Sequence, residues 1–191
     1  VMGFLHIQNN PLLEDIDGLA NIEQVGGFLQ MDNLPLLNNV DGFGKLETVA
    51  GYLHIENNPL LENIDGLTNL EAVGGALRIQ RNDALRDIDG LSNLTDVGGN
   101  IMIESNGALE NVDGLLKLVH VPGYIDIKEN DAMTHVDGLA SLKSTGGYFA
   151  LENNDILVDT KGLLGLETVG GNLWVVRNYA LENIDGLVNV E

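Results

Sequence analysis

The amino-acid sequence predicts a repeat solenoid, a coil of eight 24-residue turns with a parallel β-sheet along one face and few or short helices. Three observations predict this fold. The chain repeats itself every 24 residues, apolar and variable residues alternate within each repeat, and glycine recurs at two fixed places. A fixed period of this length is typical of solenoids, in which each unit buries its apolar edge against its neighbours.

The repeats occupy the whole chain. The turns begin at Val1, Val25, Val49, Val73, Val97, Val121, Thr145 and Val169. Their consensus is V-G-G-x-L-x-I-x-x-N-x-x-L-x-x-I-D-G-L-x-x-L-x-x, with positions numbered 1 to 24 below. We therefore expect one solenoid domain over residues 1–191, without terminal caps of its own, that belongs to a longer chain or to an assembling unit.

Positions 5 to 8 of each turn predict a β-strand. Positions 5 and 7 are apolar, as in Leu5 and Ile7, whereas positions 4, 6 and 8 vary, and this alternation is typical of a half-buried strand. Stacking the turns about 4.8 Å apart would create a parallel sheet and one continuous core. Positions 13, 16, 19, 22 and 1 are also apolar, which suits a coil of short turns with one edge inward.

Two residue types, glycine and asparagine, recur at fixed positions of the repeat. Glycine fills positions 3 and 18 in all eight turns, beginning with Gly3 and Gly18, so these positions need either a positive φ or a close backbone approach and form two corners. Asparagine fills position 10 in seven turns and is expected to bond to backbone groups of its own and the neighbouring turn. Because Leu34 interrupts this asparagine ladder, the second turn is expected to be locally irregular.

An acidic column lies at position 17. It consists of Asp17, Asp41, Asp65, Asp89, Asp113, Asp137 and Asp185, with Lys161 in the seventh turn. Parallel carboxylates about 5 Å apart repel by about 1 kcal/mol per pair in water, so something must offset the repulsion. One explanation is that each Asp caps the backbone of the I-D-G-L corner. The other is a Ca²⁺ site at Asp15, Asp17, Asp87 and Asp89, but the exchange to Lys161 favours capping.

The outer face of the predicted sheet carries the candidate binding residues. Six of the nine aromatic side chains fall at positions 4 and 6. The candidate ligand-binding residues on this face are Phe4, His6, Phe28, Tyr52, His54, Arg78, Tyr124, Asp126, Tyr148 and Trp174. Aromatic side chains among acids and amides are typical of a strip that binds protein or sugar. The alternative is that the rings only favour strands and pack on their cross-strand neighbours.

Composition narrows the range of partners. Nine basic and 29 acidic residues give a net charge of −20, so nucleic acid, which needs clustered Lys and Arg, is a poor partner. No apolar run approaches the roughly 20 residues that span a bilayer, so we expect no membrane insertion. There is no cysteine, and no cofactor is indicated apart from the calcium alternative.

No catalytic constellation is recognisable. His6 and His54 share a face but are two turns apart, near 10 Å at the strand spacing, which is too far for one zinc ion. Carboxylate pairs occur everywhere along the chain, and a regular rod provides no cleft of the kind that glycosidases need. We therefore expect a protein that is not an enzyme.

The motif L-E-x-V-G-G-x-L-x-I-x-N-N-x-x-L-x-x-I-D-G-L stands at residues 46–67 and 166–187. It resembles the receptor L-domain type of leucine-rich repeat, which occurs in growth-factor receptors, fungal cell-wall proteins and bacterial surface proteins. The resemblance implies a leucine-rich-repeat or right-handed β-solenoid-like fold and an extracellular or cell-surface module that binds protein or glycan without catalysis. The chain departs from the eukaryotic members because it lacks their flanking cysteines.

A structural role is the alternative function. The first turn begins with core residues such as Val1 and Leu5, and the last turn carries Leu173 and Val175 in the same pattern. Uncapped ends would expose apolar surface and free strand edges, which favour pairing with another chain. Head-to-tail self-association into a stalk or filament is therefore the second hypothesis.

Overall fold

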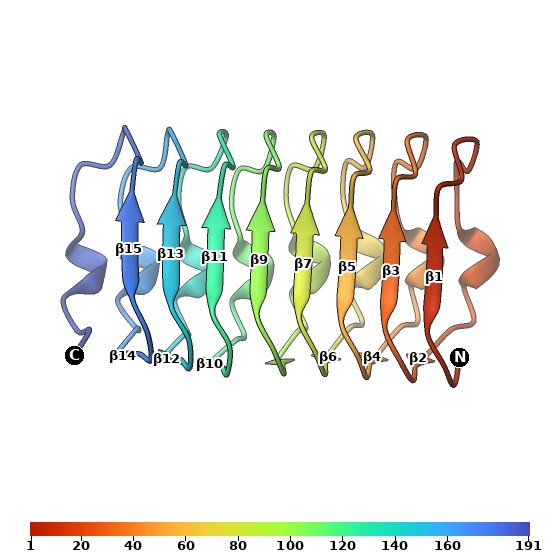
Figure 1. Ribbon diagram of the computed structural model, residues 1–191, viewed down its shortest axis with the longest axis horizontal. Helices are drawn as coiled ribbons and strands as arrows, with labels where there is room; N and C mark the ends of the chain where they lie inside the picture. The colour runs from red at the N-terminus through yellow and green to blue at the C-terminus, as the bar shows by residue number, and fades with distance from the viewer.

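The computed structural model describes residues 1–191 and confirms a rod of eight stacked turns (Figure 1). Each turn contributes a four-residue strand to a sheet on one face, and each strand is followed by a sharp corner and a coil. That coil contains a short 3-10 helix on the opposite side of the rod. No helix exceeds three residues, and none is long or apolar enough to cross a membrane.

The main sheet is parallel and in perfect 24-residue register. Its strands are β1 (Leu5–Gln8), β3 (Leu29–Asp32), β5 (Leu53–Glu56), β7 (Leu77–Gln80), β9 (Ile101–Glu104), β11 (Ile125–Lys128), β13 (Phe149–Glu152) and β15 (Leu173–Val176). Leu5 pairs with Leu29 and Leu29 with Leu53, so side chains of one repeat position form straight columns along the rod. Sequence position therefore translates directly into a place on the surface.

Two smaller sheets run along one edge of the rod. Their two-residue strands are β2 (Gln24–Val25), β4 (Thr48–Val49), β6 (Ala72–Val73) and β8 (Asp96–Val97), then β10 (His120–Val121), β12 (Ser144–Thr145) and β14 (Thr168–Val169). Pro122 separates the two groups. It has no N–H to donate to Val97, whereas Gly98 donates to the Val73 carbonyl and Gly146 to the Val121 carbonyl.

The 3-10 helices occupy positions 17 to 19 of the turns. They are η1 (Asp17–Leu19), η2 (Asp41–Phe43), η3 (Asp65–Leu67), η4 (Asp89–Leu91), η5 (Asp113–Leu115), η6 (Asp137–Leu139), η7 (Lys161–Leu163) and η8 (Asp185–Leu187). Each turn directs the third residue of its helix inward, as with Phe43 and Leu67, which are fully buried. The helices therefore close the core on the side that faces away from the main sheet.

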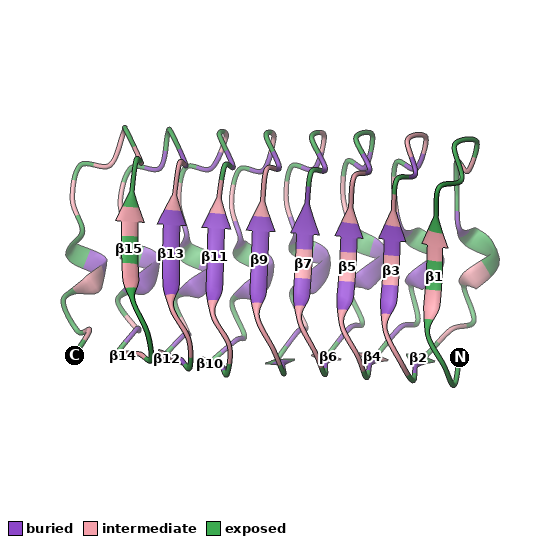
Figure 2. Ribbon diagram, viewed as in Figure 1, coloured by how far each residue is buried: buried purple, intermediate pink, exposed green.

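One apolar core runs through the rod. It contains 42 buried residues, and the apolar residues of the first and last turns, such as Leu5 and Leu173, pack against it only partly buried. Figure 2 shows the difference: β1 and β15 carry exposed and half-buried residues, whereas the strands between them carry buried and half-buried residues. Each interior turn is thus completed by its two neighbours.

The asparagine ladder forms as predicted. Asn106 donates its side-chain amide to the Ile79 carbonyl of the preceding turn at 3.0 Å, and its oxygen accepts the Asn82 backbone N–H at 3.1 Å. Asn82 repeats this arrangement one turn earlier with the Ile55 carbonyl. These side chains satisfy backbone groups that would otherwise be buried without partners.

The predicted irregularity at Leu34 is wrong. The Leu34 N–H donates to the Asn58 side chain at 3.0 Å, and the Leu37 N–H donates to the Leu34 carbonyl as the corresponding residues do in other turns. The side chain is fully buried in the core. The backbone stays regular because Leu34 loses only its own side-chain bonds, toward the exposed first turn.

The glycine corners arise from close approach and not from positive φ, since no glycine has a positive φ. A Cβ on Gly90 would lie 1.9 Å from the Ile64 carbonyl oxygen of the preceding turn. The left-handed conformation occurs instead at position 9, and these residues are Asn9, Asn33, Asn57, Arg81, Ser105, Glu129, Asn153 and Arg177. Only the four asparagines among them could have signalled this from sequence.

The predicted side-chain bond to the backbone N–H of the I-D-G-L corner is present, but the side chain at position 15 makes it and not the one at position 17. The N-cap residue at position 16, such as Ile16 or Ile88, makes no side-chain capping bond, and no side chain at position 17 accepts a backbone N–H. In seven of the eight turns the side chain at position 15 accepts the backbone N–H of position 17 instead, as Asp87 does from Asp89 at 3.1 Å and Asn111 from Asp113 at 3.0 Å. The exception is the sixth turn, where position 15 is His135. This is an Asx turn, in which the acceptor lies two residues before the donor.

Candidate binding surface

The aromatic side chains of the outer sheet face form two stacked ladders. In the first, Phe4 and Phe28 have ring centroids 4.7 Å apart, Phe28 and Tyr52 4.5 Å, and Tyr52 and His54 4.0 Å. In the second, Tyr124 and Tyr148 are 4.3 Å apart, and Tyr148 and Trp174 are 5.1 Å apart. The position-4 rings stack at nearly the strand spacing because register places them directly opposite one another. His54 and Trp174 are position-6 rings, and each stacks on a position-4 ring of its own or the preceding turn.

Each position-4 tyrosine leans over position 6 of the preceding turn. The Tyr52 hydroxyl donates to Gln30 at 3.2 Å, Tyr124 donates to the sulfur of Met102, and Tyr148 donates to Asp126. These contacts are diagonal across neighbouring strands, a distance that aromatic side chains can span. The hydroxyl ends of the rings therefore cover side chains that the period-2 pattern assigns to the surface.

Position 6 is consequently less exposed than predicted. Met102 is only 7% exposed and Ala150 1%, although both were expected on the outer face. Asp126, a candidate ligand-binding residue, is 8% exposed and lies beneath Tyr148. Direct contact between Asp126 and a ligand stays a prediction. The role of Asp126 in the structure is to support the second ladder.

Charged groups beneath the second ladder interact closely. Lys128 lies 3.2 Å from Glu104 and 3.4 Å from Asp126. Burial opposes the charge of Lys128, but the two carboxylates outweigh it and raise the lysine pKa above its usual value. Burial, and then Asp126, raises the pKa of Tyr148, so its hydroxyl stays protonated and remains a donor. The Oδ1 atom of Asp126 is buried without a hydrogen-bond partner.

A second charged group lies at the end of the first ladder. Glu56 approaches both the Nδ1 atom of His54 and the Nη1 atom of Arg78 at 3.5 Å. Burial, and then the charge of Arg78, lowers the pKa of His54 from 6.5 to about 4. His54 is therefore neutral at physiological pH and acts as a further stacked ring on Tyr52.

The structure sorts the predicted site residues into three groups. The first ladder holds Phe4, Phe28, Tyr52 and His54, with His6 at its edge, and the second holds Tyr124, Tyr148 and Trp174 above Asp126. Arg78 lies between the two ladders, on β7. The interruption was readable in the sequence, because position 4 is Ala76 in the fourth turn and Asn100 in the fifth.

The acidic column forms a separate surface at the 3-10 corners. Burial raises the pKa of Asp89, and the neighbouring charges of Asp87, Asp113 and Asp65 raise it further. Of the calcium candidates, Asp15 and Asp87 each use one oxygen for the backbone N–H of Asp17 or Asp89. No group of three or more His, Cys, Asp or Glu side chains converges with metal-holding geometry.

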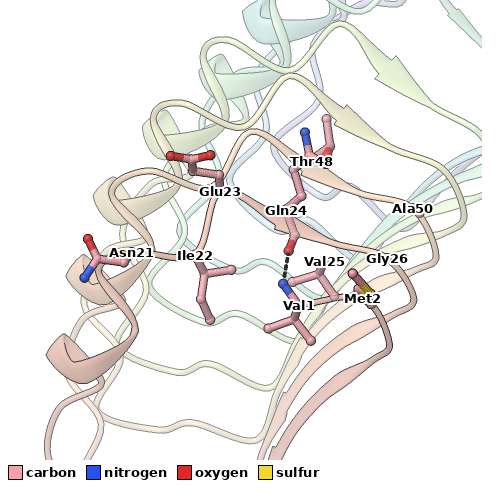
Figure 3. Close-up of a pocket in the computed structure, with 10 residues that line it drawn as sticks. All are labelled: Val1, Met2, Asn21, Ile22, Glu23, Gln24, Val25, Gly26, Thr48 and Ala50. Atoms are coloured by element: carbon pink, nitrogen blue, oxygen red, sulfur yellow. Dashed lines mark hydrogen bonds between the residues drawn. The ribbon is translucent and has the colours of Figure 1, made fainter.

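The hollows of the surface lie away from the aromatic ladders. One lies at the first turn, where the Val1 amino group donates to the Gln24 carbonyl at 2.8 Å (Figure 3). Another lies where Pro122 separates the two smaller sheets, beside His120 and Lys117. Neither contains a ladder residue, so the candidate surface is a ridge of ring edges and not a cleft.

Comparison with known proteins assigns no family. No family profile matches the chain, and no characterised protein is significantly similar to it. The likeness to receptor L-domain repeats therefore rests on the repeat motif alone, and the fold that the structure does establish is a solenoid of parallel strands and 3-10 turns.

Proposed function

We propose that this solenoid is a non-enzymatic, extracellular or cell-surface module for binding or adhesion, which presents the outer face of its main sheet to a protein or glycan ligand. The observation that carries the proposal is the pair of aromatic ladders. They gather six of the nine aromatic side chains on one face, and Trp174 is 40% exposed there. Partly exposed aromatic side chains are enriched in interfaces because they offer large contact area.

Two further features support a binding module. The repeat motif resembles receptor L-domain repeats, whose members are typically extracellular and bind ligands without catalysis. The net charge of −20 maintains solubility and disfavours nucleic acid as a partner. Neither feature identifies the ligand, so the direct test concerns the surface itself.

The test replaces Tyr124, Tyr148 and Trp174 with serine in one variant and measures attachment to panels of immobilised secreted proteins and glycans. We expect attachment of the wild-type chain and its loss in the variant, with an unchanged circular dichroism spectrum. Tyr179→Ser is the matched control, because Tyr179 is 77% exposed but lies outside the ladders. Attachment that survives the triple replacement would mean that the rings of the second ladder only stabilise the sheet.

End-to-end stacking remains the second candidate function. The observation that favours it is the partial exposure of the core residues in the first and last turns. In-register stacking of two chains would pair β1 of one with β15 of the other. Sedimentation velocity over a wide concentration range tests this idea, and a monomer at all concentrations would exclude it.

A further inference from the structure

The two ladders are separated by a notch above Arg78. We use "notch" for the gap in the position-4 column at Ala76 and Asn100, bounded by the first ladder on one side and by Tyr124 on the other. Three strand spacings, about 14 Å, separate Tyr52 from Tyr124. Stacking of His54 on Tyr52 takes up 4.0 Å of this distance. The remaining length exceeds one stacking distance, and the contacting side chains of Arg78 and Met102 lie within it.

The notch exists because neither Ala76 nor Asn100 has a ring that could cover position 6 of the preceding turn. Wherever position 4 is a tyrosine, it covers position 6 of the preceding turn, as Tyr148 covers Asp126. Asn100 occupies the place from which a ring would cover Arg78, and the Asn100 side chain instead accepts the Tyr124 backbone N–H at 3.1 Å. The Arg78 side chain is consequently 34% exposed, against 11% for Asp126.

The guanidinium of Arg78 is incompletely satisfied. Its Nη1 atom lies 3.5 Å from Glu56, its Nη2 atom donates only to the sulfur of Met102 at 3.7 Å, and its Nε atom has no partner. A planar, weakly hydrated cation of this kind stacks favourably on aromatic rings. The opposite wall is Tyr124, which stacks on Tyr148 as its single aromatic neighbour and donates its hydroxyl to Met102 in the turn of Asn100.

Charge selects the class of guest. A cationic guest would meet Arg78. An anionic guest would meet Glu56 and Glu104, on a chain whose net charge is −20. A neutral aromatic ring avoids both repulsions and offers its electron-rich face to the guanidinium. It would also continue the ladder at the spacing that register imposes on Tyr124 and Tyr148.

We propose that the notch receives one aromatic side chain of a protein partner, which stacks on the open face of Tyr124 and lies over Arg78. This inference rests on the proposed function and makes it more specific, because it selects a protein ligand and names the point of insertion. Within the ladders the inner ring faces are occupied by neighbouring rings, and a sugar would find only single platforms at the end rings Phe4 and Trp174. At the notch, a ring that stacks on a single aromatic neighbour lies near a cation whose Nε atom lacks a hydrogen-bond partner.

The experiment follows the methionine methyl groups by NMR during titration with N-acetyl-tyrosinamide. Met102 borders the notch, whereas Met31 and Met133 are fully buried elsewhere and serve as internal references. We expect a saturable ring-current shift of Met102 alone, in the millimolar range. N-acetyl-leucinamide and sodium acetate should leave Met102 unshifted, and an equal response to either would overturn the aromatic class.

Two variants locate the effect. Asn100→Tyr supplies a ring from within the chain and should abolish the Met102 response. Asn172→Tyr, the same exchange at position 4 of the last turn, should preserve it. Arg78→Lys keeps the charge but removes the planar guanidinium, and should raise the dissociation constant at least about fivefold. An unchanged response in Asn100→Tyr, or in Arg78→Lys, would refute the proposed contacts.

Failure here is distinguishable from failure of the proposed function. If Asn100→Tyr still attaches to the ligand that the triple serine variant loses, the ladders bind and the notch is not the point of insertion. If both variants still attach, neither the second ladder nor the notch is the binding surface.

Discussion

At the scale of single residues, backbone proximity between turns decides which residue types are allowed. From the second turn onward, position 18 excludes every side chain because the carbonyl of the preceding turn lies where a Cβ would stand, as Ile64 does for Gly90. Position 9 tolerates asparagine, serine, arginine and glutamate at a left-handed φ between 53° and 57°, because its side chain points away from the stack into open solvent or toward its own column. The cost of a residue therefore depends on its neighbour 24 or 26 residues away.

Gly90→Ala is expected to destabilise the solenoid by about 2–3 kcal/mol, since a Cβ 1.9 Å from the Ile64 oxygen forces the two turns apart. Urea unfolding measures the change. Gly107→Ala is the matched control: nothing lies within 4 Å of its Cβ and its φ is not positive, so that variant should be neutral or slightly more stable. Equal losses in both variants would contradict the close-approach explanation.

The burial of His54 gives a pH dependence of stability. Because its pKa falls from 6.5 to about 4 on folding, the unfolded chain binds the proton more readily, and stability is lost as pH falls from about 6.5 toward 4. We expect a loss on the order of 1–2 kcal/mol after solvent screening. His54→Gln should flatten this part of the profile, whereas His120→Gln, at an exposed site, should leave it unchanged.

At the scale of elements, the strands and the asparagine ladder were predictable because they depend on one repeat and its identical neighbour. The burial of Met102 and Asp126 was not, since it depends on whether the next turn carries a ring two positions earlier in the repeat. The Asx turn was assigned to position 17 because Asp is more regular there, whereas Asp and Asn share position 15. The repeat pattern therefore predicted the secondary-structure elements, whereas diagonal contacts between neighbouring turns determine which side chains are exposed on the sheet face.

Pro122→Ala should join the two edge sheets. The new backbone N–H can donate to the Val97 carbonyl, as Ala50 donates to Val25 at the same repeat position. The gain of about 0.5–1.5 kcal/mol from the bond is offset by a more flexible unfolded chain, so we expect little net change in stability. Hydrogen exchange is the decisive measurement: the amide at position 122 should be protected to the level of Ala50, and exchange at the unprotected rate would refute the bond.

At the scale of the whole molecule, register aligns charges as faithfully as it aligns rings. The net charge of −20 is distributed over columns, and the position-17 column places Asp65, Asp89 and Asp113 in direct succession. Partial burial, and then the repulsion from neighbouring carboxylates, raises the pKa of Asp89, so its charged form is less favourable in the folded chain. Lys161 relieves the same repulsion in the seventh turn, where its hydrogen bond lowers the pKa of Asp159.

Asp89→Asn is therefore expected to stabilise the protein at pH 7, by about 0.3–1 kcal/mol at low salt. The penalty exists only while Asp89 is charged, so the gain should vanish as pH falls below the ordinary aspartate range, and it should shrink in 1 M NaCl. Asp159→Asn should act in the opposite direction, because Asp159 accepts both the backbone N–H and the ammonium of Lys161. Thermal unfolding at pH 7 and pH 3 separates the two signs.

The break at Pro122 also has a mechanical consequence. On the outer face β7, β9 and β11 remain continuously paired, whereas β8 and β10 belong to separate sheets on the edge. We therefore expect a force that stretches this edge to bend the rod most easily in the fifth turn, because the edge sheets are not joined there. Asn100 belongs to the same turn, so bending there alters the width of the notch. Small-angle scattering should show a narrower range of rod curvature in Pro122→Ala than in the wild-type chain. A force that bends the rod would then also change its affinity for a ligand in the notch.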